Sequence, residues 1–407
     1  MPTPVHETVA DFGTGLTSAF EADVRTHAAP GHHARLRAAY GFDDVAIVPG
    51  VETLHPDDVD LRWELGGRRF SIPFIASAMD GVVDVPFAVA LGKLGGLAVL
   101  NLEGLQTRYE QPQEVLAEIA AAPRESVTEL MQQLYQAPIR DDLAARRVEE
   151  IRAAGVDAAV SSTPSLAERL GPVVAEAGAS VFVVKSTVTS RRFRSHNGNP
   201  PLDFGRFCRS LRLPVVVGNC VGFAAALELM ETGIAGLLVG VGPGAACTSR
   251  EVLGIGVPQV TATMDCASAR DAFYARTGRY VPIVTDGGMR TGGDICKAFA
   301  SGADAVMIGS PFAQAEEAPG RGHHLGMATP HAGLPRGTRI KVGVGGSLER
   351  ILFGPTSLTN GTQNLVGALR TCMGVCGAAS LREMHGVEMV IAPAIKTEGK
   401  SWQLSGA

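Results

Sequence analysis

The chain has 407 residues and 45% of them are hydrophobic, so it can bury a large core as one big α/β domain or two smaller ones. This composition excludes disordered and fibrous proteins. The formal net charge is -5 and the 36 Lys and Arg residues are scattered, which argues against binding to DNA, RNA or a membrane surface. No apolar run approaches the roughly 20 residues that cross a bilayer, and the N-terminus lacks a signal pattern, so we expect a cytoplasmic protein that acts on a small molecule.

Residues 1–35 show little hydrophobic periodicity and predict a loosely ordered arm that can also make oligomer contacts. From residue 36 to residue 407, short β-branched runs alternate with longer Ala- and Leu-rich helical stretches, as in a parallel sheet built from βαβ units. Several runs are almost continuously apolar, which is typical of strands covered on both faces. Eight runs have this character: Phe74–Met79, Leu97–Asn101, Ala158–Ser162, Val181–Ser186, Val215–Asn219, Gly236–Gly240, Pro282–Gly287 and Ala305–Ser310.

The number of units decides between two α/β architectures. Eight units close into a barrel, so we predict a single-domain (β/α)8 TIM barrel. A doubly wound open sheet would show the same alternation, but the Gly-x-Gly-x-x-Gly fingerprint after its first strand is absent. Between the second and third runs, residues 103–157 have a helical pattern and are too few for an inserted pair of globular modules.

Polar and glycine-rich residues follow five of the predicted strands. Because a barrel places its active site at the C-terminal ends of its strands, these segments are candidate site loops. They are Ser77-Ala78-Met79-Asp80, Gly218-Asn219-Cys220, Gly242-Pro243-Gly244, Asp286-Gly287-Gly288 and Gly309-Ser310.

The loop after the sixth predicted strand carries the candidate nucleophile. Its glycine-rich turn leads to Cys247, followed by Thr248, Ser249 and Arg250, and we expect Thr248 and Ser249 to be catalytic residues together with Cys247. Glycines let the backbone approach a ligand closely, and exposed amides with a following helix N-terminus favour the thiolate, which is the nucleophilic form of cysteine. The seven cysteines are an odd number at irregular spacing, which argues against a disulfide framework. The alternative is a buried structural cysteine in a tight turn.

The same loop resembles the catalytic loop of the IMP dehydrogenase and GMP reductase family, whose pattern is Gly-x-Gly-Pro-Gly-Ser-x-Cys-Thr-Thr-Arg. The resemblance continues in order along nearly the whole chain after residue 35, without the family's usual inserted CBS modules, as in a short bacterial subgroup related to IMP dehydrogenase. The matching blocks are Gly254-Ile255-Gly256-Val257-Pro258-Gln259, Asp286-Gly287-Gly288-Met289-Arg290, Gly302-Ala303-Asp304-Ala305-Val306-Met307 and Glu316-Glu317-Ala318-Pro319-Gly320.

This resemblance implies a site for a purine nucleoside monophosphate, GMP or IMP. Cys247 is the implied nucleophile and Asp286 the acceptor for the ribose hydroxyls, since a carboxylate can accept two bonds from a diol. Backbone amides at loop ends form the implied phosphate cup. The remaining implied nucleotide contacts are Ser77 and Met79 at the base and ribose, Asn219 beside the purine, Gly288, Gly309 and Ser310 at the phosphate, and Gly326 and Met327 in the flap.

Further assignments concern the second substrate and an ion. We expect Asp80 and Lys185 to lie at the nicotinamide cofactor, NADPH or alternatively NAD. In some family members the catalytic loop binds a monovalent cation through carbonyls, which makes Gly242, Gly244 and Cys247 the candidate ligands of K+. By the same resemblance we expect a homotetramer or its dimer.

Several positions depart from the family pattern. The His-Lys after the second strand is replaced by Asn101-Leu102-Glu103, so the family lysine is lost. The Ser two residues before the nucleophile is Ala245, and the Asp after the fourth strand is Lys185. These changes preserve the phosphate cup while altering the chemistry around it.

The flap, residues 315–345, bears on the direction of the reaction. Dehydrogenases of the family activate water with an Arg-Tyr pair, which this flap lacks. Reductases of the family use a Glu and a Thr that lies two residues past the nucleophile. In this chain Ser249 takes the place of the Thr, and the Glu aligns with Pro330. The neighbouring His331 could replace the Glu, because a histidine titrates near neutrality and suits proton transfer. A His that only hydrogen-bonds the nucleotide is the alternative role for His331.

Four functional hypotheses remain. The first is GMP reductase, which converts GMP and NADPH to IMP, ammonia and NADP through an adduct of Cys247 with purine carbon 2. The second is IMP dehydrogenase, which converts IMP, NAD and water to XMP through the same adduct. The others are a relative that acts on a modified purine nucleotide and an inactive nucleotide sensor. The flap favours the first.

Overall fold

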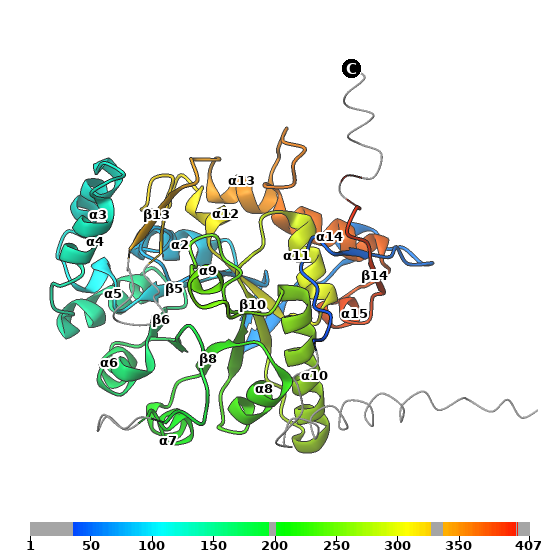
Figure 1. Ribbon diagram of the computed structural model, residues 1–407, viewed down its shortest axis with the longest axis horizontal. Helices are drawn as coiled ribbons and strands as arrows, with labels where there is room; N and C mark the ends of the chain where they lie inside the picture. The colour runs from blue at the N-terminus through cyan, green and yellow to red at the C-terminus, as the bar shows by residue number, and fades with distance from the viewer. Residues whose placement is uncertain (1–35, 195–200, 327–336, 396, 398–407) are drawn as a thin grey trace, which may run out of the picture. The chain divides into compact units, whose positions relative to one another are not determined.

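The computed structural model describes residues 36–194, 201–326, 337–395 and 397, and Ala39–Ala407 form one compact unit. Eight parallel strands close into a barrel, with helices around it (Figure 1). The predicted (β/α)8 architecture is confirmed, and each predicted run matches one barrel strand, with β8 ending one residue beyond its run. The strands are β4 (Phe74–Ala76), β5 (Leu97–Asn101), β6 (Ala159–Ser162), β7 (Val181–Lys185), β8 (Val215–Cys220), β9 (Gly236–Val239), β10 (Ile283–Asp286) and β11 (Ala305–Ile308).

Helices separate successive strands, as βαβ units require. The sheet closes where β11, the last barrel strand in the chain, pairs with β4, the first. The strands are apolar on both faces because one face lines the barrel interior and the other meets the helices. The surrounding helices are α2 (Val85–Lys93), α5 (Asp141–Ala153), α6 (Pro164–Glu176), α7 (Phe204–Leu211), α8 (Phe223–Met230), α10 (Gln259–Thr277), α11 (Gly292–Ala300), α13 (Leu348–Phe353), α14 (Leu365–Val375) and α15 (Leu381–Met384).

Short antiparallel pairs complete the unit outside the barrel. The pair β1 with β14 joins the beginning of the described chain to its end. A second pair, β2 with β3, precedes the first barrel strand. The bounds of these strands are Val45–Ile47 for β1, Met389–Ile391 for β14, Trp63–Leu65 for β2 and Arg68–Phe70 for β3.

A buried ion pair holds the N-terminal end of β10. The Asp304 carboxylate accepts hydrogen bonds from Arg270 Nη1 at 2.8 Å, from the Tyr280 hydroxyl at 2.5 Å and from the Ile283 amide at 2.8 Å. The Arg270 side chain is only 2% exposed. Because both charges are withdrawn from water, each depends on the other.

We expect Asp304→Ala to lower the free energy of unfolding by about 3–5 kcal/mol, since it leaves the Arg270 charge buried without this partner. The matched control is Asp271→Ala. Asp271 pairs with the same arginine at 2.8 Å but is 65% exposed, so its loss should cost at most about 1 kcal/mol. Urea unfolding of both variants measures the difference, and equal effects would contradict the assignment.

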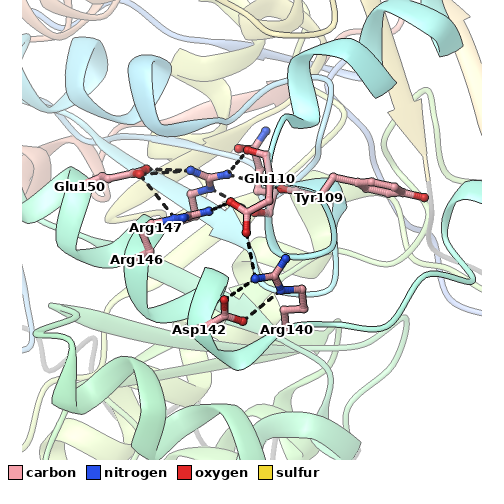
Figure 2. Close-up of polar contacts among 8 residues, drawn as sticks. Tyr109, Glu110, Arg140, Asp142, Arg146, Arg147 and Glu150 are labelled. Carbon is pink, nitrogen blue, oxygen red and sulfur yellow. Dashed lines mark hydrogen bonds and ion pairs between the residues drawn. The ribbon is translucent and has the colours of Figure 1, made fainter.

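Residues between β5 and β6 form four helical elements rather than a globular insertion. They are the 3-10 turn η3 (Leu105–Thr107), α3 (Pro112–Ala121), α4 (Val127–Leu134) and α5. Figure 2 shows the polar network that fixes the turn after η3 onto α5. The Arg147 guanidinium donates to the carbonyls of Gln106 and Glu110 at 3.1 and 3.0 Å and pairs with Glu150 at 3.1 Å. Arg147 is buried, so these bonds also satisfy its donors.

The helices α3 and α4 pack against a hairpin formed by β12 (His323–Gly326) and β13 (Thr338–Lys341). Leu325 of β12 is 2% exposed and belongs to a small apolar core, separate from the barrel core, with residues of η3, α3 and α4. On β13, Arg339 Nη1 donates to the carbonyls of Ile119, Ala120 and Ala122 at 2.6, 3.0 and 2.8 Å. A cation bonded to these carbonyls stabilises the C-terminal end of α3.

We expect Arg339→Ala to release the end of α3 from the hairpin. Hydrogen bonds from a charged group contribute roughly 1.5–3 kcal/mol, which is about tenfold or more in a local opening equilibrium. Hydrogen exchange of the α3 amides should therefore accelerate by at least about tenfold. Lys341→Ala, on the same face of β13, is the control and should leave α3 unchanged. Equal exchange in both variants would show that Arg339 does not hold α3.

Candidate active site

The carboxyl ends of β8 and β10 bring together an amide and a carboxylate. Asn219 Nδ2 donates to Asp286 Oδ2 at 2.8 Å, which orients the carboxylate at the mouth of the barrel. Burial raises the pKa of Asp286, while the Asn219 hydrogen bond and the charge of Lys185 oppose the increase. Among the described residues, no hydrogen bond is made to Asp286 Oδ1, so this oxygen is available to a ligand.

The loop between β9 and α9 (Ser249–Leu253) presents Cys247 at the same end of the barrel. The Cys247 amide donates to Gly244 O at 3.0 Å, which makes a tight turn. The thiol donates to the hydroxyl of the buried Ser249 at 3.3 Å. Arg250 donates to the carbonyls of Val241 and Val257 at 3.2 and 2.9 Å and so ties the two ends of the loop together. The thiol is therefore held on a braced turn and remains partly exposed.

Five of the other six cysteines are buried or have a raised thiol pKa. Cys220 and Cys266 are buried with their sulfurs 3.9 Å apart. Burial raises the pKa of Cys208 to about 11 and that of Cys376 to about 11, so both thiols stay protonated at neutral pH. All seven cysteines are free thiols, and of these Cys247 alone lies in a glycine loop at a strand's carboxyl end.

The loop after β10 lies directly against the Cys247 loop. Gly287 and Gly288 both have φ of 83°, a left-handed conformation that favours glycine. A Cβ at Gly288 would lie 3.0 Å from the Pro243 side chain, and one at Gly287 would lie 3.5 Å from the Gly244 nitrogen. The absence of a side chain at Gly288 thus permits the close approach of the Asp286 loop to the nucleophile's loop, and Gly287 is favoured by its left-handed backbone.

A third part of the site forms where the barrel closes. The Ser77 amide donates to Ile308 O at 2.9 Å, so the residues after β4 and β11 lie side by side. Gly309 follows β11 and precedes α12 (Ser310–Ala313). A Cβ at Gly309 would lie 2.8 Å from His324 Nε2 and 3.6 Å from Ser77 Oγ. Imidazole, hydroxyl and bare backbone therefore meet at this point.

The hairpin β12–β13 reaches the mouth on its other face. A Cβ at Gly326 would lie 2.7 Å from the carbonyl oxygen of Ala246, the residue before the nucleophile. Leu325, its neighbour on the strand, points instead into the core formed with α3 and α4. Because successive residues of a strand face opposite sides, the hairpin contacts the catalytic loop with one face and the helical segment with the other.

Lys185, at the end of β7, spans the mouth of the barrel. Its Nζ donates to Ala78 O at 2.8 Å, beyond the end of β4. Burial lowers the pKa of Lys185, and the nearby carboxylates of Asp286, Glu103 and Asp80 oppose this. The Lys185 ammonium therefore interacts electrostatically with carboxylates of the protein, including that of Asp286, which is predicted to bind the ribose.

Asp80 connects the mouth to the helical segment. Its Oδ2 accepts hydrogen bonds from the Leu105 amide at 3.0 Å and from the Tyr135 hydroxyl. Burial raises the pKa of Asp80, against the opposing effects of these two bonds and of the Lys185 charge. Tyr135 follows α4, so the segment that packs on the hairpin is also bonded to the end of β4.

The family model for the IMP dehydrogenase / GMP reductase domain matches residues 39–329, which is more than half of the chain and includes all eight barrel strands. The chain belongs to this family. An uncharacterized oxidoreductase from Mycolicibacterium smegmatis is 41% identical over 364 residues, which cover 87% of this chain and 97% of that protein. An inosine-5'-monophosphate dehydrogenase from Cryptosporidium parvum is 30% identical over 381 residues, which cover 84% of this chain and 89% of that protein.

The fold agrees with a solved member of the family. The crystal structure of an IMP dehydrogenase/GMP reductase-like protein from Corynebacterium glutamicum matches with a TM-score of 0.82 at 34% sequence identity, covering 92% of this chain and 100% of that one. The family is one of oxidoreductases, and CBS modules are not seen among the described residues. Within those residues, no helix has the length and apolarity that a membrane span requires.

The structure places most of the predicted site residues at one end of the barrel. Ser77, Asn219, Cys247, Asp286 and Gly309 follow or end strands whose carboxyl ends meet there. Met79 and Gly288 lie in the same loops, and Ser310 begins α12. Met327 and His331 lie outside the described residues. The roles assigned to all of these residues, Thr248 included, stay predictions.

The expected cofactor and ion contacts also stay predictions. Asp80 and Lys185 are both engaged with other protein groups. For K+, Gly244 O already accepts the Cys247 amide, and a carbonyl has a second lone pair for a cation. Among the described residues, no group of three or more His, Cys, Asp and Glu side chains could hold a metal ion.

Two residues of the site region had no individual role in the sequence analysis. Tyr135 lies in the helical segment and bonds to Asp80, a contact between positions 55 apart in the chain. His324 lies at the barrel mouth against Gly309. The sequence signal for His324 was the alternation of side chains along a strand, which places His324 on the face of β12 opposite to that of His323.

Proposed function

We propose that this protein is a GMP reductase, which converts GMP and NADPH to IMP, ammonia and NADP through a covalent adduct on Cys247. The observation that carries the proposal is the loop geometry at the barrel mouth. The nucleophile's turn lies against the loop that bears the Asn219-bonded Asp286 carboxylate. A thiol beside a polar nucleotide cradle is what attack on a purine ring bound through its ribose and phosphate requires.

Each group has a task in this reaction. Asp286 accepts the ribose hydroxyls through its available oxygen, and Asn219 fixes the carboxylate. The Cys247 sulfur forms a bond to purine carbon 2, and the carbon–nitrogen bond to the exocyclic amine breaks. The thiol proton passes through the Ser249 hydroxyl, which already accepts it in a hydrogen bond, to the departing ammonia. Bound NADPH would supply a hydride to carbon 2, and Cys247 would leave carbon 2 as the thiolate as IMP is released.

The direction of the reaction follows from what the flap lacks. Both family reactions share the adduct, so the outcome depends on whether water or hydride reaches carbon 2 first. Attack by water needs a general base, whose assistance is typically worth about 10²–10⁴-fold. Residues 315–345 contain no tyrosine and thus no Arg-Tyr pair. Hydride transfer requires no base, so NADPH is the faster reactant.

A spectrophotometric assay with the full chain tests this proposal. The absorbance of reduced nicotinamide is followed with GMP plus NADPH, and separately with IMP plus NAD. We expect NADPH to be consumed with GMP, and IMP and ammonia to appear in equal amounts. Faster formation of XMP from IMP and NAD would assign the protein as an IMP dehydrogenase instead. No turnover with either pair, together with tight nucleotide binding, would indicate the nucleotide sensor.

A further inference from the structure

Three free thiols gather where α11 and α14 pack side by side (Figure 1). Cys296 lies on α11, Cys372 lies on α14, and Cys376 caps the C-terminal end of α14. The Cys372 sulfur is hydrogen-bonded to the thiols of both other residues. The Cys296 sulfur also lies 3.6 Å from Ala368 O, the carbonyl that accepts the Cys372 amide in a regular α-helix. Three nucleophilic groups therefore meet at one point outside the Cys247 loop.

The packing of the two helices determines which thiols can join. A Cβ at Gly292 of α11 would lie 2.4 Å from the Ala368 Cβ of α14, so glycine permits a very close crossing. Cys296 and Cys372 each lie four residues, about one turn, beyond this contact. A disulfide needs Cβ atoms roughly 3.5–4.5 Å apart, which facing side chains at such a crossing can reach. Cys372 and Cys376, four residues apart on one helix, have Cβ atoms about 5–6 Å apart, which is too far.

Cys372 is the thiol of this cluster that an oxidant can reach and ionise most readily. It is partly exposed, whereas Cys296 is 3% exposed. The hydrogen bond from Cys296 lowers the pKa of Cys372; burial opposes this decrease, and the bond from Cys376 adds to it. The same bond and burial raise the pKa of Cys296. Since the thiolate is the form that peroxides oxidise, the first reaction belongs to Cys372, with Cys296 behind it.

We propose that Cys372 and Cys296 form a peroxide-reactive dithiol that closes to a disulfide between α14 and α11. The Cys372 thiolate attacks one oxygen of hydrogen peroxide, the O–O bond breaks, and the departing hydroxide takes up the proton that the thiol released. The Cys296 sulfur then attacks the sulfenic acid, the S–O bond breaks, and the hydroxyl leaves with the Cys296 proton as a second water. Two thiols lose two electrons, and the peroxide is reduced to two waters.

A second pair of sulfurs in the protein shows what the dithiol requires. Cys220 and Cys266 lie 3.9 Å apart, as close as a reactive pair would be. They are only 2% and 0% exposed, and the contact with Cys220 together with burial raises the pKa of Cys266. Neither thiol of this pair is both accessible and ionised, so we expect both to stay reduced. The pair is thus an internal control for proximity without access.

The test uses the full wild-type chain and hydrogen peroxide. Free thiols are then blocked with N-ethylmaleimide under denaturing conditions, and a tryptic digest is analysed by mass spectrometry without reduction. Trypsin places Cys296 in residues 291–297 and Cys372 in residues 371–382. We expect these peptides to be joined, with a mass two hydrogens below their sum, and to separate after treatment with dithiothreitol. The peptides of Cys220 and Cys266 should carry maleimide.

Variants separate the two steps. Cys296→Ser should stop the reaction at the sulfenic acid of Cys372, which dimedone traps. Cys372→Ser should slow the oxidation of Cys296 by at least about tenfold, because only a buried thiol with a raised pKa remains. Cys208→Ser, which removes a thiol of α7, is the matched control and should cross-link as the wild type does.

Two results in the wild type, which need no variant to fold, would overturn the inference. The first is that Cys296 and Cys372 both remain reduced after prolonged exposure to excess peroxide. The second is a different end product, either a disulfide between Cys372 and Cys376 or an over-oxidised Cys372 without a cross-link. The measurement involves neither nucleotide nor turnover, so its outcome is independent of the proposed reductase activity.

Discussion

Replacing Cys247 with serine is expected to reduce turnover by more than about a thousandfold while nucleotide binding is retained. Removing a covalent nucleophile typically costs several orders of magnitude in rate because the residual activity comes from binding groups alone. In the proposed function, the Asn219–Asp286 pair and the Gly309 backbone hold the nucleotide without the thiol, and neither depends on Cys247 for its place. Serine keeps the shape of the turn, whose bond from the residue 247 amide to Gly244 O is made by backbone.

The matched control for this variant is Cys208→Ser. Cys208 lies on α7, away from the strand ends, and burial raises the pKa of its thiol to about 11. The control should keep wild-type turnover. Steady-state rates and equilibrium binding of GMP separate the two effects for each variant. A Cys247→Ser enzyme with rates close to those of the wild type would show that the reaction does not pass through the thiol.

Asp286→Ala is expected to weaken nucleotide binding by roughly 1.5–3 kcal/mol for each ribose hydrogen bond lost, which is about tenfold or more per bond. The carboxylate is held in place by Asn219 and has an oxygen available to the ligand. Asp286→Asn is the matched variant, since it keeps the size of the side chain but only one acceptor oxygen. It should weaken nucleotide binding, but by less than Asp286→Ala does. Calorimetric titration with GMP or IMP measures both.

The same residue should make binding sensitive to acid. Burial raises the pKa of Asp286, and the protonated carboxyl is a weaker acceptor for the ribose hydroxyls because it carries no charge. Nucleotide affinity should therefore decline as the pH falls toward this raised pKa, above the range where an ordinary aspartate titrates. Unchanged affinity in Asp286→Ala would place the nucleotide elsewhere on the protein.

The barrel was predictable because its signal is local. Each strand is a short apolar run, such as Val215–Val217, and each is followed by glycine or polar residues that cannot extend it. Closure follows from the count of units, which pairs β11 with β4. Cys247 could likewise be singled out from its glycine-rich loop, once the resemblance of that loop to the family's catalytic loop was taken into account. Short segments of sequence therefore carried both the architecture and the candidate nucleophile.

Contacts between distant segments were not predictable in this way. The Tyr135 bond to Asp80 and the Arg339 bonds to the end of α3 join positions that no periodic pattern relates. They depend on how the helical segment packs on the hairpin, which is decided by the shape of a small apolar core around Leu325. The engagement of Lys185 with Ala78 O is of the same kind, because it spans the barrel mouth between β7 and the end of β4.

The central claim is that the purine becomes bonded to Cys247, and it is tested most directly by trapping that adduct. Wild-type protein is incubated with GMP without NADPH, quenched in acid, digested and analysed by mass spectrometry. The account predicts that the peptide containing Cys247 gains the mass of GMP less ammonia, and that added NADPH removes this modification before the quench. An adduct on a different cysteine, or none during demonstrated consumption of NADPH with GMP, would contradict it.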